Sequence, residues 1–150
     1  MDLLSLLNEN ARLTNAQLAV MLGKTEEEVE KEIADYQQKG IIKGYKALIN
    51  WEKVDHHKTT ALIELKVQPK KESGFDEIAK KIMQFSKVES VYLMSGGFDL
   101  AVMVHGDSIQ DIAMFVAKRL SPLDSVLSTA THFILTRYKE GDVILRSEER

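Results

Sequence analysis

The sequence of 150 residues predicts an α+β fold, in which an N-terminal winged helix-turn-helix is followed by a ferredoxin-like β-α-β-β-α-β domain. Between residues 14 and 40, two short helical segments are joined by a turn that contains glycine, which is the helix-turn-helix pattern. From residue 59 onward, apolar segments of strand type alternate with apolar stripes at helical spacing. We therefore divide the chain into a helix-turn-helix domain at residues 1–49, a linker at 50–58, a ferredoxin-like domain at 59–140 and a flexible charged tail at 141–150.

The first two helices are predicted from their leucines and their ends. The leucines between Leu3 and Leu7 indicate a short first helix. Thr14 or Asn15 is placed to cap a second helix, because either side chain can accept a hydrogen bond from a free backbone N–H of the first turn. Gly23 ends this helix, since glycine adopts the left-handed conformation that is common at helix C-termini.

The third helix would be the recognition helix of the motif. It begins with a capping box, in which Thr25 supplies the hydroxyl and Glu28, three positions later, the carboxylate. Its inward face is indicated by apolar residues at helical spacing: Val29, Ile33 and Tyr36. Gly40 ends the helix, and Tyr45–Ile49 is expected to form a short strand or wing.

The second domain is predicted element by element from Thr59. Strands are expected over residues 59–67, 88–94, 99–104 and 125–138. Pro69 ends the first strand and Pro122 ends the second helix, because proline lacks a backbone N–H. The two helices are indicated by apolar stripes at Phe75, Ile78, Ala79, Ile82 and Met83 and at Ile109, Ile112, Ala113, Val116 and Leu120.

Two of the predicted strands are apolar on both faces. Residues 61–63 and 100–104 are consecutive apolar residues, whereas a sheet that is covered on one face only should alternate between apolar and polar. The two helices can cover one face. We expect the same sheet of a second chain to cover the other face, which gives a two-fold homodimer.

The composition excludes several classes of function. The absence of cysteine excludes disulfides, thiolate zinc sites and thiol catalysis, and it fits a reducing cytoplasm. No apolar run approaches the roughly 18 residues of a membrane span, and the first residues lack the basic leader of a signal peptide. The histidines, His56, His57, His105 and His132, lack the spacing of a metal site. No catalytic triad or nucleotide-binding loop is present. We therefore expect a cytoplasmic protein that binds no metal, cofactor or membrane and is not an enzyme.

The predicted recognition helix is acidic. Between Thr25 and Lys39 it contains six carboxylates and two lysines. Helices that bind DNA usually supply cations, because neutralising phosphates releases counterions. Acids in the first turn of a helix also interact favourably with the helix dipole, which is a purely structural explanation. The same turn, however, would meet base edges in the major groove.

Together these patterns resemble the Lrp/AsnC family, the leucine- and asparagine-responsive regulators of bacteria and archaea. The resemblance covers nearly the whole chain, from about Asp2 to Glu140. It rests on the order and spacing of Leu18-Ala19, Gly23, Val29, Ile33, Gly40-Ile41-Ile42, Tyr45, Gly96–Leu100, Val126, Thr129 and Thr131. The family implies a transcription factor that dimerises through its C-terminal sheets and assembles further into octamers. It also implies that amino acids or related metabolites bind between dimers, near the turn that here is Gly96–Asp99.

The helix-turn-helix gives candidate contacts to double-stranded DNA. Phosphate contacts are expected from cations around the domain, with Lys39 among them, and base contacts from the start of the recognition helix. Glutamate can accept a hydrogen bond from cytosine N4. The candidate residues are Arg12, Lys24, Thr25, Glu27, Glu28, Lys31, Glu32, Lys43 and Lys46. Recognition helices of the family usually carry arginines where this chain has Glu30–Glu32, so one domain alone should bind DNA weakly and depend on assembly.

The segment Gly96-Gly97-Phe98-Asp99 is the candidate ligand site. The glycines permit positive φ in a hairpin and Asp99 can close it by bonding its own backbone, which explains the turn structurally. Free N–H groups on such a turn can also hold the carboxylate of an amino acid. Asp99 would then pair with the ammonium group, and Phe98 would contact the side chain. Thr129 and Thr131 are candidate polar partners on the last strand.

Two other functions stay open at this point. The acidic helix is compatible with a ligand-sensing or protein-binding oligomer that has lost strong DNA binding. Some Lrp/AsnC-like proteins act in haem biosynthesis as sirohaem decarboxylases, and this chain offers only scattered histidines for such chemistry. A DNA-binding regulator that senses a small molecule is the main hypothesis.

Overall fold

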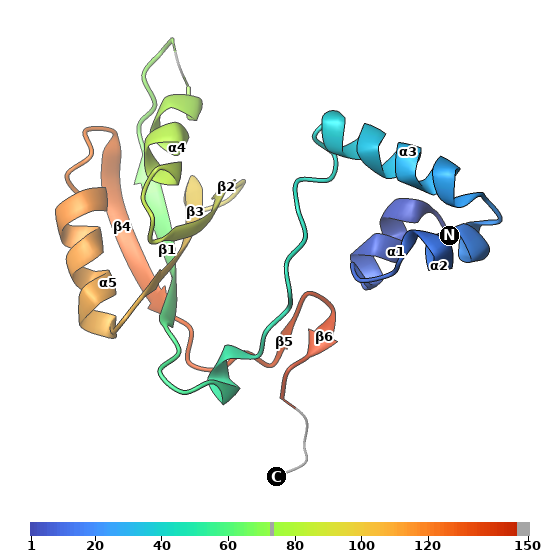
Figure 1. The fold of residues 1–150 in the computed structure, drawn as a ribbon. Helices are drawn as coiled ribbons and strands as arrows, with labels where there is room; N and C mark the ends of the chain where they lie inside the picture. The colour runs from blue at the N-terminus through green and yellow to red at the C-terminus, as the bar shows by residue number, and fades with distance from the viewer. Residues whose placement is uncertain (73, 147–150) are drawn as a thin grey trace. The chain divides into compact units, whose positions relative to one another are not determined.

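The computed structural model describes residues 1–72 and 74–146, which form two compact units that divide after Ile49 (Figure 1). The first unit contains helices, and the second contains a four-stranded sheet with helices. The predicted α+β class is confirmed. Within the described ranges, no helix has the length and apolar character that a bilayer crossing requires.

Three helices make up the first unit: α1 (Leu3–Glu9), α2 (Asn15–Leu22) and α3 (Glu26–Gln38) (Figure 1). Their shared core consists of buried Leu3, Leu6, Leu7, Leu18, Ala19 and Val29. Burying a large aliphatic side chain stabilises a fold by roughly 1.5–3 kcal/mol, so this small cluster holds the three helices together whatever the charge on α3.

Local hydrogen bonds fix where these helices begin and end. Asp2 caps α1, and its carboxylate accepts a hydrogen bond from Ser5 N at 2.8 Å. Thr14 and Thr25 each form a complete capping box, at the starts of α2 and α3. Gly23 ends α2 in the left-handed conformation, with φ of 65°. The helix ends predicted from the sequence at Thr14, Gly23 and Thr25 are confirmed, whereas the cap at Asp2 was not predicted.

The strand expected over Tyr45–Ile49 is not formed. The backbone amides of Ile41 and Ile42 donate to the carbonyl oxygen of Tyr36, at 2.8 and 3.1 Å, which closes the end of α3. Residues 42–49 then continue without regular structure. A strand needs a neighbour for its N–H and C=O groups, and none of the described residues supplies one here.

The second unit is built on an antiparallel sheet with the strand order β2-β3-β1-β4. Its strands are β1 (Thr59–Val67), β2 (Val88–Leu93), β3 (Leu100–Gly106) and β4 (Val126–Phe133). Its helices are α4 (Asp76–Met83) and α5 (Ile109–Phe115), which continues as a π-helical segment η2 (Val116–Leu120). The predicted β-α-β-β-α-β order is confirmed (Figure 1).

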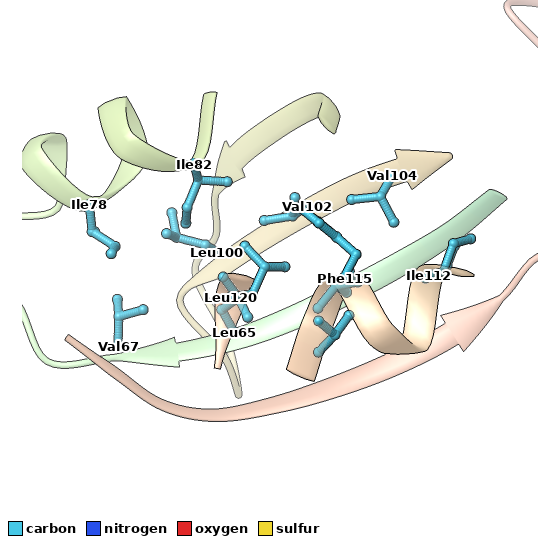
Figure 2. Close-up of a cluster of buried hydrophobic side chains, with 13 residues drawn as sticks. Leu65, Val67, Ile78, Ile82, Leu100, Val102, Val104, Ile112, Phe115 and Leu120 are labelled. Carbon is cyan, nitrogen blue, oxygen red and sulfur yellow. The ribbon is translucent and has the colours of Figure 1, made fainter. Parts of the chain in front are cut away.

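One face of the sheet packs on the helices. Figure 2 shows Leu65, Val102 and Val104 from the strands beside Ile82 and Phe115 from the helices. Alternate strand residues supply this core, as the period of two along a strand requires. Both helices therefore cover the same face.

None of the helices in the described part of the chain covers the other face of the sheet, which is partly apolar. Leu62 lies opposite Met103 in the register, and both side chains are half-buried. At its edge His132 Nε2 lies 3.3 Å from Glu64 Oε1. The two-faced apolar pattern of β1 and β3 thus has one covered and one uncovered side within this chain.

The end of the chain differs from the prediction. β4 stops at Phe133, not at Tyr138, and a hairpin of β5 (Lys139–Glu140) and β6 (Val143–Ile144) follows. The tail expected from residue 141 is therefore ordered as far as 146, and residues 147–150 lie outside the described range. The expected linker contains a short helix η1 (Trp51–Lys53), and Asn50 Nδ2 donates to Leu145 O at 3.0 Å. Residues 50–58 thus group with the second unit.

Candidate DNA-binding and ligand-binding sites

The helix-turn-helix presents one side of α3 to solvent. Val29 is fully buried, whereas Glu27, Glu30 and Lys31 are exposed. Helical periodicity places these three residues together on the outward face. Among the described residues, none of the three side chains has a hydrogen bond or an ion pair, so this part of the helix is free to contact a partner.

Two of the candidate DNA contacts form the capping box at the start of α3. Glu28 N donates to Thr25 Oγ1 at 3.1 Å, and Thr25 N donates to Glu28 Oε2 at 3.4 Å. These bonds satisfy N–H groups that the first turn of a helix would otherwise leave free. Thr25 and Glu28 therefore hold the start of α3 in place.

Lys24 and Glu32 form an ion pair across the turn. Lys24 Nζ donates to Glu32 Oε2 at 2.7 Å, and this hydrogen bond raises the pKa of the lysine. Tyr36 Oη donates to Glu32 Oε1 at 3.3 Å. Burial first, and then the Glu32 carboxylate, raise the pKa of Tyr36. The structure thus brings Lys24 and Glu32 together as an ion pair, in which each side chain binds the other.

A second ion pair lies at the other end of α3. Lys39 Nζ is 2.7 Å from Asp35 Oδ2, and the hydrogen bond to this carboxylate raises the pKa of Lys39. Four candidate cations remain exposed and without a side-chain partner among the described residues: Arg12, Lys31, Lys43 and Lys46. Six cations were expected to contact phosphates, and carboxylates of α3 pair with two of them, Lys24 and Lys39.

The Gly96–Asp99 turn joins β2 to β3 and is anchored to β1. Asp99 N donates to Leu65 O at 2.9 Å, and Val67 N donates to Asp99 Oδ2 at 2.9 Å. The side chain of Asp99 thus bonds the neighbouring strand, whereas the sequence had suggested that it would bond the backbone of its own turn. The turn itself is closed by the carbonyl oxygen of Asp99, which accepts from Met94 N at 2.8 Å. Of the two glycines, Gly96 alone has a positive φ, at 145°. The amides of Gly96, Gly97 and Phe98 make no backbone hydrogen bond among the described residues.

The structure does not place Thr129 and Thr131 beside this turn within one chain. They lie opposite Leu65 and Ile63 in the register, so their side chains share the helix-covered face. β1 lies between β4 and the turn. One β1 residue, Leu65, contacts both regions, through its backbone.

Sequence reasoning missed a cavity at the opposite end of the sheet, where β1 begins and β3 ends. Its wall includes Trp51, His56, His57, His105 and Arg137. The local signal was a tryptophan and two histidines inside a short polar segment. Arg137 joins them only through tertiary contacts, which no local pattern reveals.

Comparisons with known proteins identify the family. The Lrp/AsnC ligand binding domain matches residues 60–144. YugG of Bacillus subtilis (strain 168), an uncharacterized HTH-type transcriptional regulator, is 48% identical over 97% of this chain and 89% of its own length. The HTH-type transcriptional regulator LrpA of Pyrococcus abyssi is 28% identical over 91% of this chain and 94% of its own.

Solved structures agree with this fold. Transcriptional regulator NMB0573 from Neisseria meningitidis, determined as a complex with L-Met, superposes with a TM-score of 0.71 at 22% identity. The superposition covers 90% of this chain and 86% of that one. Since the family match spans more than half of the chain and a relative of high identity spans nearly all of it, the chain belongs to the Lrp/AsnC family of HTH-type transcriptional regulators.

Proposed function

We propose that the chain is a DNA-binding transcriptional regulator that responds to an amino acid or a related small metabolite. The observation that carries this proposal is the helix-turn-helix, in a chain 48% identical to a protein named as an HTH-type transcriptional regulator. Because its target is the DNA of the cell, we place its action in the cytoplasm. Its relatives are named as regulators, and we propose regulation, not catalysis.

The proposed DNA contacts follow from which side chains of the first unit are free. Arg12, Lys31, Lys43 and Lys46 would contact phosphates, since each is exposed and unpaired among the described residues. Glu27, on the outward face of α3, would accept a hydrogen bond from cytosine N4. Thr25 and Glu28 would shape the start of the helix, and the Lys24–Glu32 pair would add little net charge.

We further propose that two chains dimerise through the uncovered face of the sheet. Leu62 and Met103 give this face an apolar centre, which a second copy can bury. The family suggests further assembly into octamers. Joining several helix-turn-helix units raises their effective concentration on one DNA, and this can compensate for weak binding by each unit.

The effector is proposed to bind at the Gly96–Asp99 turn. The amides of Gly96, Gly97 and Phe98, which have no partner in the described part of the chain, suit a carboxylate, because successive N–H groups concentrate partial positive charge. NMB0573, which shares the fold, is a complex with L-Met, and we therefore propose an amino acid as the first ligand to test. Asp99 Oδ1 is the oxygen that remains available for an ammonium group, since Oδ2 accepts from Val67 N.

A DNA-binding measurement tests the regulatory function. Fluorescence anisotropy of a labelled duplex from the region upstream of the chain's own gene is measured at several salt concentrations, with and without each amino acid. We expect binding at low salt, a shallow salt dependence and a shift in affinity with at least one amino acid. Lys31→Ala should weaken binding, whereas Lys118→Ala in the second unit should not. Absence of binding at low salt under all these conditions would contradict the proposal.

A variant of the turn tests the effector site separately. An added Cβ at Gly97 meets no atom within 4 Å, so Gly97→Ala should fold normally while placing a methyl group beside the free amides. We expect calorimetry to show weaker amino-acid binding with an unchanged melting temperature. Unaltered binding would place the effector elsewhere.

A further inference from the structure

A cavity of about 440 Å³ lies in the second unit, beyond the start of β1. It is open to solvent on one side and is lined by η1 and the loop that follows it, by the end of β3 and by the segment that leads to β5. This volume is within the range of small-molecule sites. The cavity is distinct from the Gly96–Asp99 turn, because Asp99 immediately precedes β3 and His105 lies near the other end of this strand, six residues or about 20 Å away.

Arg137 supplies the principal charge of the cavity. Its side chain is only 16% exposed. Nη2 donates to Thr60 Oγ1 at 2.6 Å, while Nε lies 3.8 Å from Glu140 Oε2, a loose contact with a half-exposed carboxylate. A guanidinium carries five N–H donors, so these contacts leave most of them unused. A largely buried guanidinium in this state favours an anion that can accept several of its hydrogen bonds.

Three imidazoles share the same wall. The Nδ1 of His105 is buried and makes no hydrogen bond with the described residues, although Glu89 Oε1 lies 3.0 Å away. His57 Nδ1 lies 3.2 Å from Val54 O, which leaves Nε2 available. His56 has a positive φ of 59°, a conformation that is unfavourable for most residues and recurs at functional sites.

The remaining wall combines an apolar, aromatic part with three charged side chains. Trp51 is 47% exposed and Val54 is 43% exposed, and both line the cavity. The wall also contains Lys58 and the carboxylates of Glu89 and Glu140, so its fixed charges balance. Balanced charge does not suit a polyanion such as DNA. It suits a small ligand with one acidic group and a flat apolar body.

We propose that this cavity binds a small organic anion. Arg137, with the imidazoles of His56 and His57, would hold its carboxylate or phosphate group, and Trp51 would contact its apolar part. Glu140 would move toward solvent when the ligand takes its place beside Arg137. This site does not depend on the DNA-binding function or on the effector site at the turn.

The tryptophan provides the measurement, because Trp51 is the only one in the chain. The full chain is titrated with benzoate, phenyl phosphate and benzyl alcohol, three aromatic probes that differ in their polar group. We expect a saturable change in tryptophan fluorescence with benzoate or phenyl phosphate and none with benzyl alcohol. Comparison of the two anions identifies the preferred acidic group. No saturable change with either anion at millimolar concentration would overturn the proposal.

Variants connect the signal to the residues. Arg137→Gln should weaken anion binding by about tenfold or more, because it removes a charge-assisted hydrogen bond. His56→Asn should weaken it less and leave the loop intact, since asparagine tolerates the left-handed conformation. Arg119→Gln, on η2 outside the cavity, is the matched control for lost charge. If Arg137→Gln disturbs folding because its hydrogen bond to Thr60 is lost, the affinity of His56→Asn for the anion tests the assignment. Wild-type affinity in His56→Asn and in any folded Arg137→Gln protein would refute the assignment.

Discussion

Lys24 Nζ and Glu32 Oε2 lie 2.7 Å apart, so the turn of the helix-turn-helix is tied by an ion pair to the middle of its recognition helix. Lys39 and Asp35 form a second pair of the same length at the helix end. The acidic residues of α3 therefore have two effects on DNA binding. They leave the helix with few cations of its own. Its carboxylates also occupy lysines that could otherwise contact phosphates.

Glu32→Gln should strengthen DNA binding by releasing Lys24. Glutamine can still accept from Tyr36 Oη, so the local packing is conserved while the ion pair is lost. One additional lysine on the phosphates should increase the magnitude of the slope of log affinity against log salt by about 0.9. Fluorescence anisotropy at several salt concentrations measures this slope.

Glu30→Gln is the control for that prediction. It removes the same charge from α3, but Glu30 is exposed and holds no lysine among the described residues. Its slope should equal that of the wild type. Equal slopes for both variants would show that Lys24 does not reach DNA even when it is free.

Gly106 is predicted to tolerate no side chain. A Cβ at this position would lie 2.7 Å from Asp111 Oδ2 and 2.8 Å from Ile112 Cγ1. Ile112 is fully buried, and Asp111 Oδ2 already accepts from Lys87 Nζ and from Asp107 N, so neither can move freely. Gly106→Ala should destabilise the second unit by about 1–3 kcal/mol. Gly97→Ala, with open space around its Cβ, should stay within about 0.5 kcal/mol of the wild type in chemical denaturation.

Asp111 should make part of the stability depend on pH. The hydrogen bond from Lys87 first, and then that from Asp107 N, lower the pKa of Asp111 in the folded state. A carboxyl group with a lowered folded pKa stabilises the fold above its unfolded pKa of about 3.9, and this stabilisation is lost as the pH falls through the folded pKa. Asp111→Asn should therefore melt below the wild type at neutral pH, and the difference should shrink on acidification.

Asp55→Asn is the matched substitution for this experiment. Asp55 is exposed and has no hydrogen bond or ion pair with the described residues. Its melting temperature should follow that of the wild type across the same pH range. A constant difference between Asp111→Asn and the wild type at every pH would mean that Asp111 acts by packing and not by its charge.

The sequence predicted the ends of elements that depend on residues close by in the chain. It missed the ends that depend on pairing with residues far away in the chain. Gly23 and Thr25 set helix ends with their own backbone and side chain, so both could be predicted. β4 ends because β1 begins: Phe133 pairs with Ala61, and Ile134 N bonds to Thr60 O, beyond which the described strand offers no partner. The β5–β6 hairpin did have a local signal, since Gly141 and Asp142 both adopt positive φ in its turn.

The same distinction applies to the sites. The exposed outward face of α3 followed from helical periodicity. The pairing of Lys24 with Glu32 joins a turn residue to a position about two helical turns away. The composition of α3 predicted only that the helix is acidic, and not which lysines its carboxylates bind. The bond from Val67 N to Asp99 Oδ2 depends on strand order, which the turn sequence does not contain.

The uncovered face of the sheet should decide the assembly state. Met103 lies at its centre, opposite Leu62. Met103→Glu places a charge on a surface that a single chain exposes to water but that a dimer would bury, where an unpaired charge is costly. We expect light scattering coupled to size exclusion to report a smaller mass for Met103→Glu than for the wild type, together with weaker DNA binding.

Met114→Glu is the control, because Met114 is 43% exposed on α5, on the helical side of the sheet. Its mass should match the wild type. An unchanged mass in Met103→Glu would show that the chains associate through another surface. Assembly through that other surface would then have to compensate for the weak DNA binding of the acidic recognition helix.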